Sequence, residues 1–258
     1  MEELYIVEPK LYKLPQSIGK LKNLKFLTIF KTPIKEIPES FGNLEKLEEI
    51  TISRAHLKSF PIELCNLKNL RELKLNENQI KEIPECIQTL KSLESLKLSN
   101  NQINGFPKIL AKLPQLKVLS LDNNPIKTIP ESIKSLSNLV SLTLNNTDLT
   151  EIPKFYCNLT KLVALELNNN LISSIPNCIG NLSKLGRLEL ANNNISELPS
   201  SLINLNNYIA FDLRNNNIKE FPSFLAKVNM RKLDLRGNPI KKFPKKVGRL
   251  KMEVEGLY

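Results

Sequence analysis

The sequence has no tryptophan, one histidine and only four cysteines among its 258 residues. Catalytic triads and zinc sites draw on histidine and cysteine, so these counts leave little room for either. We therefore expect no catalytic residue, no metal and no cofactor, which argues against an enzyme. No apolar run approaches the roughly 20 residues that a membrane-spanning helix needs. The first ten residues, MEELYIVEPK, lack the basic and apolar regions of a signal peptide.

What the chain does have is charge, in the proportions of a soluble globular protein. Charged residues make up 24% and hydrophobic residues 41%, and the formal net charge is +11. Such an excess suits an acidic partner, whether nucleic acid, anionic membrane or acidic protein. Nucleic-acid binding calls for interleaved aromatic residues or a helix that enters a groove, and neither pattern is visible. We therefore expect a protein partner and no nucleic acid.

Proline is periodic along the whole sequence. Eleven of the sixteen prolines form one series, spaced by 23 residues nine times and by 22 once, and an apolar residue precedes each of them. Leucine and isoleucine recur in step, so that the repeating unit reads LxxLxLxxNxIxxIPxxIxxL. The series consists of Pro15, Pro38, Pro61, Pro84, Pro107, Pro130, Pro153, Pro176, Pro199, Pro222 and Pro244.

This unit resembles the leucine-rich repeat, and the resemblance covers essentially the whole chain. The 23-residue form with a central IP or LP is similar to the intracellular Ras-group repeats. The Lys-, Asn- and Ile-rich composition is more similar to the leucine-rich-repeat proteins of spirochaete bacteria. The resemblance implies an α/β fold: a right-handed solenoid, or horseshoe, with a parallel concave sheet and short helical or 3₁₀ segments on the convex side.

The same architecture follows from the physics of the repeat. Leucines two apart lie on one face of a strand, and a lone strand cannot bury that face, so successive units must stack. After each proline the apolar spacing becomes three, which predicts a helical or 3₁₀ return. We expect about eleven strands in one solenoid over 1–258, with a possible twelfth through Met252 and Val254. Residues 1–14 form a partial first repeat without a dedicated cap, and 241–258 a truncated capping repeat.

An asparagine occupies the same place in most repeats, where the chain turns inward. Its amide both donates and accepts, so it can satisfy backbone groups that the buried turn leaves unpaired. Thr32 and Thr147 are partial substitutes, and Ala55 cannot hydrogen-bond through its side chain. We therefore expect this structural ladder to be weakest around Ala55. The ladder asparagines are Asn78, Asn101, Asn124, Asn170, Asn193, Asn216 and Asn238.

The outward positions of the predicted strands are the candidate partner-binding surface. Their character changes along the chain, from aromatic residues through two lysines to four carboxylates. Stacked carboxylates repel each other unless cations neutralise them, and arginines two positions away, together with Lys232, are placed to do so. A self-paired ionic lattice, a partner-binding surface and a divalent-cation site all remain open. The candidates are Tyr5, Phe26, Phe30, Lys74, Lys97, Glu166, Arg187, Glu189, Asp212, Arg214, Asp234 and Arg236.

The four cysteines form two pairs with the same spacing. Cys65 and Cys157 lie four residues after their prolines, and Cys86 and Cys178 lie two residues after theirs, in the next repeat. Duplication of a four-repeat block explains why the pattern occurs twice. Side-chain rotation in a right-handed return segment predicts that each pair faces across the seam between adjacent repeats. Two thiolates fall short of tetrahedral zinc, and disulfides are reasonable only in an oxidising compartment.

We interpret the chain as a non-enzymatic scaffold that binds a protein partner on its concave face. The resemblance to spirochaete proteins implies a secreted or surface-exposed role in contact with host molecules. The resemblance to Ras-group repeats implies a cytosolic adaptor instead. A glycan or lipid ligand also remains open, and the basic cluster at 241–251 is either a solvated cap or a contact for anionic lipid.

Overall fold

The computed structural model describes residues 1–205, 207, 209–228, 230–242 and 252–253. Its contacts divide the chain into two compact units, Met1–Pro125 and Ile126–Tyr258. Each unit alternates a short strand with a single five-residue 3₁₀ segment, so the predicted repeat architecture is confirmed. Within the described part of the chain, no helix has the length and apolarity to cross a lipid bilayer.

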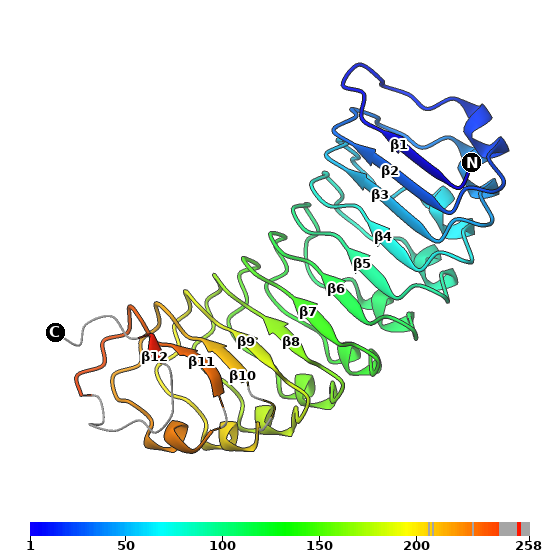
Figure 1. Cartoon of the computed structure of the whole chain (residues 1–258). Coiled ribbons are helices and arrows are strands. Elements are labelled where there is room, and N and C mark those ends of the chain that lie inside the picture. The colour runs from blue at the N-terminus through cyan, green and yellow to red at the C-terminus, as the bar shows by residue number, and fades with distance from the viewer. Residues whose placement is uncertain (206, 208, 229, 243–251, 254–258) are drawn as a thin grey trace. The chain divides into compact units, whose positions relative to one another are not determined.

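In the first unit, each strand pairs in parallel with the strand of the next repeat (Figure 1). The 3₁₀ segments of neighbouring repeats also pack beside one another, so both layers stack in sequence order. The strands are β1 (Glu3–Ile6), β2 (Phe26–Phe30), β3 (Glu49–Ser53), β4 (Glu72–Lys74), β5 (Ser95–Lys97) and β6 (Val118–Ser120). The 3₁₀ segments are η1 (Gln16–Lys20), η2 (Glu39–Asn43), η3 (Ile62–Asn66), η4 (Glu85–Thr89) and η5 (Lys108–Lys112).

The second unit repeats this arrangement. Its strands are β7 (Ser141–Thr143), β8 (Ala164–Glu166), β9 (Arg187–Glu189), β10 (Ile209–Asp212), β11 (Met230–Asp234) and β12 (Met252–Glu253). Its 3₁₀ segments are η6 (Glu131–Ser135), η7 (Lys154–Asn158), η8 (Asn177–Asn181), η9 (Ser200–Asn204) and η10 (Ser223–Lys227). The predicted twelfth strand is present at Met252, whereas Val254 lies outside the described residues, as does most of the predicted cap at 241–258.

The repeat prolines start the return segments. Each described 3₁₀ segment follows directly on a proline, whose fixed φ suits the first turn and whose carbonyl accepts the first bond. In η3, for example, the Leu64 amide donates to the Pro61 carbonyl at 3.2 Å, and the Leu67 amide donates to the Leu64 carbonyl at 3.1 Å. Residues three apart share one face of a 3₁₀ helix, and Leu64, Leu67 and Leu70 are all fully buried.

The strands β4 to β9 have only three residues each and end before the second inward leucine of their repeats. β4, for example, ends at Lys74, directly before Leu75. Beyond that point the Leu75 amide still donates to the Lys97 carbonyl at 2.8 Å, and the Glu77 amide donates to the Ser99 carbonyl at 2.9 Å. Hydrogen bonding between the two repeats therefore continues past the end of the strand. The chain then turns inward, because the next ladder asparagine draws its backbone toward the core.

The strand register slips at one place in the second unit. β10 pairs with β11 through Ile209 and Met230, but the next pair is Ala210 with Lys232, so Arg231 is an extra residue. Extra residues of this kind form a β-bulge, which turns the side chains on that strand. The slip falls in the repeat where the proline spacing shortens from 23 to 22 residues.

Each ladder asparagine bonds to the backbone of its own repeat and to that of the preceding repeat. Nδ2 of Asn124 donates to the Leu98 carbonyl and to the Leu121 carbonyl, both at 3.0 Å, while its Oδ1 accepts from the Ile103 amide at 3.0 Å. Asn78, Asn170 and Asn216 make the same kind of set. The side chains thus pair backbone groups that the buried turns expose.

The turn at Ala55 is bonded in a way that the sequence did not suggest. The amide of Ala55 itself donates to Oδ1 of Asn78 at 3.2 Å, so this backbone group is satisfied from the next repeat. In the preceding turn, the Ile34 amide donates instead to the Thr32 carbonyl at 2.7 Å. His56 also takes a left-handed φ of 61°, so the backbone adapts where the asparagine is missing.

Candidate functional site

The outward side chains of β1 to β6 form one candidate surface, which we call the first sheet face. Parallel register places Tyr5 beside Thr28, Thr28 beside Thr51, Thr51 beside Lys74, and Lys74 beside Lys97. These residues occupy the fifth position of their repeats, counted from the first leucine of LxxLxLxxN, so the outward fifth positions form a column within this unit. Tyr5 is 68% exposed, which makes it one of the most exposed large apolar side chains of the described residues.

The three aromatic candidates share this face without stacking on one another. Phe26 pairs with Glu3 rather than with Tyr5, and among the described residues the close ring pair is Phe155 with Tyr156. The ring of Phe30 instead lies near two cations: Nζ of Lys31 at 5.3 Å and the guanidinium carbon of Arg54 at 5.4 Å from its centroid. Arg54 in turn pairs with Glu77. The aromatic end of the face is therefore also a charged one.

Lys74 and Lys97 converge on a carboxylate that we had not singled out. Their Nζ atoms lie 3.1 and 3.2 Å from the two oxygens of Glu72, which occupies the third position of its repeat. Burial alone would raise the pKa of Glu72, but hydrogen bonds and charge from both lysines outweigh it, so the pKa lies below its usual range. The sequence did contain a signal for Glu72: it lies two residues before Lys74, and residues two apart point to the same face of a strand.

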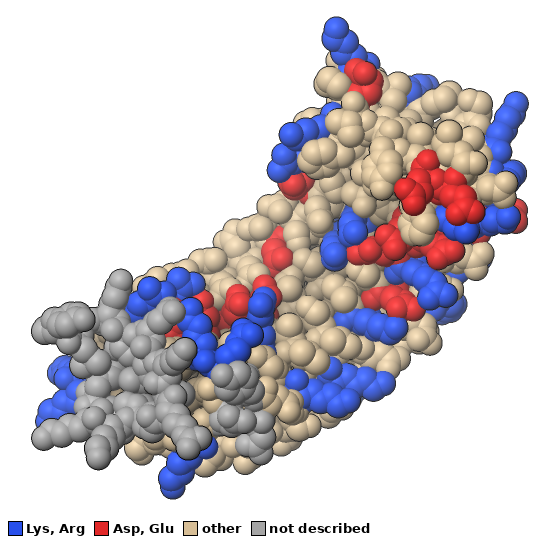
Figure 2. All heavy atoms as spheres, in the orientation of Figure 1, with Lys and Arg blue, Asp and Glu red and all other residues tan. Residues whose placement is uncertain are grey.

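The outward side chains of β7 to β11 form the second sheet face, where the acidic column lies. Register places Thr143, Glu166, Glu189, Asp212 and Asp234 side by side in turn. Arg187 bridges two of these carboxylates, with Nη1 at 3.1 Å from Glu166 and Nε at 3.6 Å from Glu189. Acidic and basic side chains are accordingly intermingled over β8 to β11 (Figure 2).

Asp234 is the most buried member of the column, at 2% exposure. Nη2 of Arg236 lies 2.6 Å from it and Nε of Arg214 lies 3.6 Å away, while Nη2 of Arg214 is 2.6 Å from Asp212. Burial alone would raise the pKa of Asp234. Hydrogen bonds from the side chain and backbone of Arg236, with the charges of both arginines, outweigh burial, and the pKa lies below its usual range.

The ion pairs surround a hollow of about 180 Å³ on the second sheet face. Arg231, the extra residue of the β-bulge, also lines it, together with Lys232. The sequence marked Lys232 but not Arg231, because a strict period of 23 assigns no place to an inserted residue. The hollow brings five cations and three carboxylates together, which is a charged recess and not an apolar ligand pocket. Its members are Arg187, Glu189, Asp212, Arg214, Arg231, Lys232, Asp234 and Arg236.

The cysteine pairs lie on the opposite layer, in the 3₁₀ segments. A disulfide joins Cys65 of η3 to Cys86 of η4, and another joins Cys157 of η7 to Cys178 of η8. The Cα atoms of the pairs are 5.7 and 5.8 Å apart, within the range that is usual for disulfides. Each disulfide crosses the seam between adjacent repeats, in the direction that the rotation argument specifies.

Within the described residues, no three or more His, Cys, Asp or Glu side chains are grouped so as to hold an ion. The carboxylates of the second sheet face are bonded to arginines instead. What the two faces offer is a set of oriented hydrogen-bond donors, carboxylates and aromatic rings on a rigid sheet.

Two family models match the sequence. One describes a leucine-rich repeat region and matches residues 108–192, and the other describes a leucine rich repeat and matches residues 47–103. A comparison with curated proteins finds no match.

Several solved structures are similar to the chain. An internalin from Listeria monocytogenes is 27% identical with a TM-score of 0.84, covering 95% of this chain and 71% of the internalin. A leucine-rich-repeat protein from Leptospira interrogans is 27% identical with a TM-score of 0.56, covering 90% and 77% of the two chains. The ectodomain of the Arabidopsis receptor kinase HAESA, solved with a peptide hormone ligand, is 31% identical with a TM-score of 0.77. That match covers 88% of this chain and 40% of the ectodomain, so bacterial and plant proteins share the repeat.

Proposed function

Because this chain is a leucine-rich-repeat protein, we propose that it is a non-enzymatic scaffold that binds a protein partner on its sheet faces. The observation that carries the proposal is that two arginines on the second sheet face are paired with carboxylates and still exposed. Arg187 and Arg214 are each held by carboxylates, yet their side chains are 50% and 44% exposed. Donors that are already oriented lose little freedom on binding, and arginine is enriched at the centres of protein interfaces.

Tyr5 supports the same role for the first sheet face. A tyrosine 68% exposed on a sheet offers a rigid ring and a hydroxyl to a partner. The partner is a folded protein or a peptide with mixed charge, because the two faces carry paired cations and carboxylates rather than charge of one sign. The peptide ligand of the HAESA ectodomain is consistent with this class of partner.

We further propose that the protein works outside the cell or on its surface, where it contacts host molecules. Two disulfides favour an oxidising compartment, because thiols in the cytosol are kept reduced. The resemblance to spirochaete proteins points the same way. A cytosolic adaptor is the alternative, and thiol counting on protein isolated from its native cells, with and without reductant, separates the two. Four free thiols before reduction would overturn the extracellular proposal.

The binding surface is tested by affinity capture from extracellular-matrix and cytosolic fractions. The triple variant Tyr5→Ser, Arg187→Gln, Glu189→Gln removes exposed groups from both faces without a change of net charge. We expect it to lose partners that the native chain retains. The matched control is Glu151→Gln with Lys184→Gln, which also leaves the net charge unchanged and alters exposed residues away from the sheet faces. Equal capture by all three proteins would overturn the proposal.

A further inference from the structure

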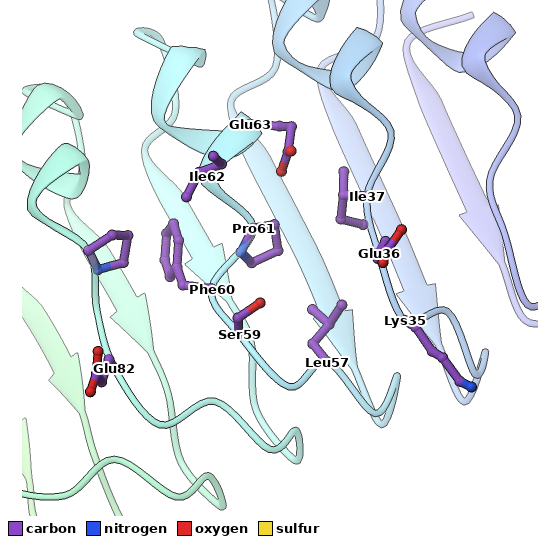
Figure 3. A pocket seen from close by; sticks show the side chains of 11 residues that line it. Lys35, Glu36, Ile37, Leu57, Ser59, Phe60, Pro61, Ile62, Glu63 and Glu82 are labelled. Carbon is purple, nitrogen blue, oxygen red and sulfur yellow. The ribbon is translucent and has the colours of Figure 1, made fainter.

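A pocket of about 430 Å³ opens on the first unit, beside the return segments and away from the first sheet face. Three consecutive repeats line it, as Figure 3 shows: residues 35–37, residues 57 and 59–63, and Glu82 with Pro84. We call it the Phe60 pocket, after the side chain at its floor. None of its lining residues belongs to either sheet face, so it is a separate site from the one proposed above.

The pocket coincides with a change in backbone angle. At Pro61, which follows a phenylalanine, ψ is 108°, whereas it is 147° at Pro38 and 156° at Pro84, which both follow isoleucine. The described prolines that follow phenylalanine, Pro107 and Pro222, have the same low ψ of 103° and 109°. A second pocket, in the second unit, also lies at a phenylalanine-proline step, Phe221–Pro222. The Phe-Pro step thus sets its return segment at a different angle from its neighbours.

The floor of the Phe60 pocket is apolar and one wall is an exposed isoleucine. Leu57, Phe60 and Ile37 are almost fully buried, whereas Ile62 is 62% exposed. The residue directly after the repeat proline is polar or charged in every other repeat: Gln16, Glu39, Glu85, Lys108, Glu131, Lys154, Asn177, Ser200, Ser223 and Lys245. Ile62 is therefore the one aliphatic exception in the series, and it stands at the edge of a hollow.

The rim of the pocket carries carboxylates that no cation neutralises. Among the described residues, no lysine or arginine lies within ion-pair distance of Glu36, Glu63 or Glu82. Lys35 also lines the pocket, but its ammonium points away from Phe60 and Ile62 in Figure 3. This contrasts with Glu72 on the first sheet face and with the acidic column of the second, whose carboxylates are paired with lysine or arginine. Three carboxylates and one lysine line the pocket, so the charge of its lining is negative although the net charge of the chain is +11.

A covalent link stiffens one wall. Cys65 lies on η3, which carries Ile62 and Glu63, and its disulfide partner Cys86 lies two residues after Pro84. The disulfide fixes the two return segments that flank the pocket. A pocket that is already formed does not spend binding energy on ordering its own walls.

From these observations we infer that the Phe60 pocket binds a peptide segment of a protein partner in which an aliphatic side chain is flanked by lysine or arginine. The aliphatic group packs against Phe60 and Ile62, and the flanking cations pair with Glu63 and with Glu36 or Glu82. The apolar floor selects the central side chain, and the unpaired carboxylates select its neighbours.

A methyl-labelled NMR titration of the full chain tests the inference with three synthetic tripeptides of capped ends. Lys-Leu-Arg is the probe, Lys-Ser-Arg lacks the aliphatic group, and Glu-Leu-Glu reverses the charge. We expect Lys-Leu-Arg to shift the methyl signals of Ile62, Ile37 and Leu57, and to bind at least about fivefold more tightly than either control peptide. Equal shifts with all three peptides, or shifts with Lys-Leu-Arg confined to other methyl groups, would overturn it.

Variants separate the pocket from general electrostatics. Glu63→Gln with Glu82→Gln should weaken Lys-Leu-Arg binding about fivefold, whereas Glu131→Gln with Glu151→Gln removes the same charge elsewhere and should leave it unchanged. Ile62→Lys should abolish the shifts, and lysine is tolerated at this position because Lys108 and Lys154 occupy it in other repeats. The methyl spectrum also reports whether each variant is folded. Equal weakening by both double variants would count against the pocket, whatever becomes of the sheet faces.

Discussion

The two units bury the same repeat but expose different side chains. In the first, the fifth-position column runs from an exposed tyrosine through threonines to two lysines that share Glu72. In the second, the same column is a row of carboxylates held by arginines. Beneath both faces, the buried leucines and isoleucines recur in the same pattern. Inward positions thus determine the fold, and outward positions are free to differ in chemistry.

The shared interior predicts equal and large effects in the two units. Asn124→Ala removes the bonds to the Leu98 carbonyl and the Ile103 amide, and each unmet group costs about 1–3 kcal/mol. We expect Asn193→Ala in the second unit to lower the free energy of unfolding by a similar amount. Urea denaturation measures both, with exposed Asn104→Ala as the control. An unchanged free energy of unfolding in both variants would mean that water, and not the asparagine, hydrogen-bonds to these backbone groups.

The disulfides sharpen the comparison because each unit has one. Both close loops of 21 residues, which the chain-entropy model values at about 3 kcal/mol each. Replacing Cys65 and Cys86 by serine should therefore cost as much stability as replacing Cys157 and Cys178. Melting temperatures with and without reductant check this. A lower melting temperature for only one of the two variants would show that the contacts between the bridged repeats differ in more than loop length.

The cores of the two units differ at one buried tyrosine. Tyr156 is fully buried, its hydroxyl has no hydrogen-bond partner among the described residues, and burial raises its pKa. Phe41 occupies the same place, three residues after its proline, in the first unit. Tyr156→Phe should raise the free energy of unfolding by about 1 kcal/mol, because an unmet buried group is removed. A drop in stability would reveal a partner for the hydroxyl.

The turns without a ladder asparagine provide a smaller test. His56 and Asp148, one in each unit, follow Ala55 and Thr147 and have left-handed φ values of 61° and 60°. Glycine adopts such angles without the clash of a Cβ, but it also loses more freedom on folding. We expect His56→Gly to stabilise by about 0.5 kcal/mol in urea, and His56→Ala to give no gain. Equal effects of the two substitutions would contradict a backbone origin.

The smallest expected effect is a dependence on pH. Because the folded pKa values of Asp234 and Glu72 are lowered, their contribution is present above the unfolded carboxyl pKa of about 4 and is lost as pH falls through the folded values. Asp234→Asn and Glu72→Gln should each flatten the decline in stability below that pH. Thermal melts from pH 5 to pH 2 measure the slope. An unchanged slope would show that the pairs contribute nothing to folding.

Periodicity predicted the elements because side-chain direction follows directly from it. Strand faces, buried return positions and the seam between Cys65 and Cys86 all depend only on where a residue lies in the repeat. The sequence was less informative where backbone angles depart from the repeat. The low ψ at Pro61 coincides with the Phe60 pocket, and His56 takes a left-handed φ. A pattern of apolar spacing that treats leucine, isoleucine and phenylalanine alike predicts neither. Glu72 was missed because, in its part of the chain, we chose only the two lysines of the fifth position, although Arg187 was chosen from the third.

The disulfides have a mechanical consequence. Each bridge joins cysteines 21 positions apart, so the segment between them cannot extend when the chain is pulled from its ends. At about 3.4 Å per extended residue, each loop withholds about 70 Å of contour length. An oxidised chain stretched between two surfaces should therefore stop lengthening about 140 Å sooner than a reduced one. The repeats outside the disulfide loops extend under tension, whereas the residues inside the loops extend only after the disulfides are reduced.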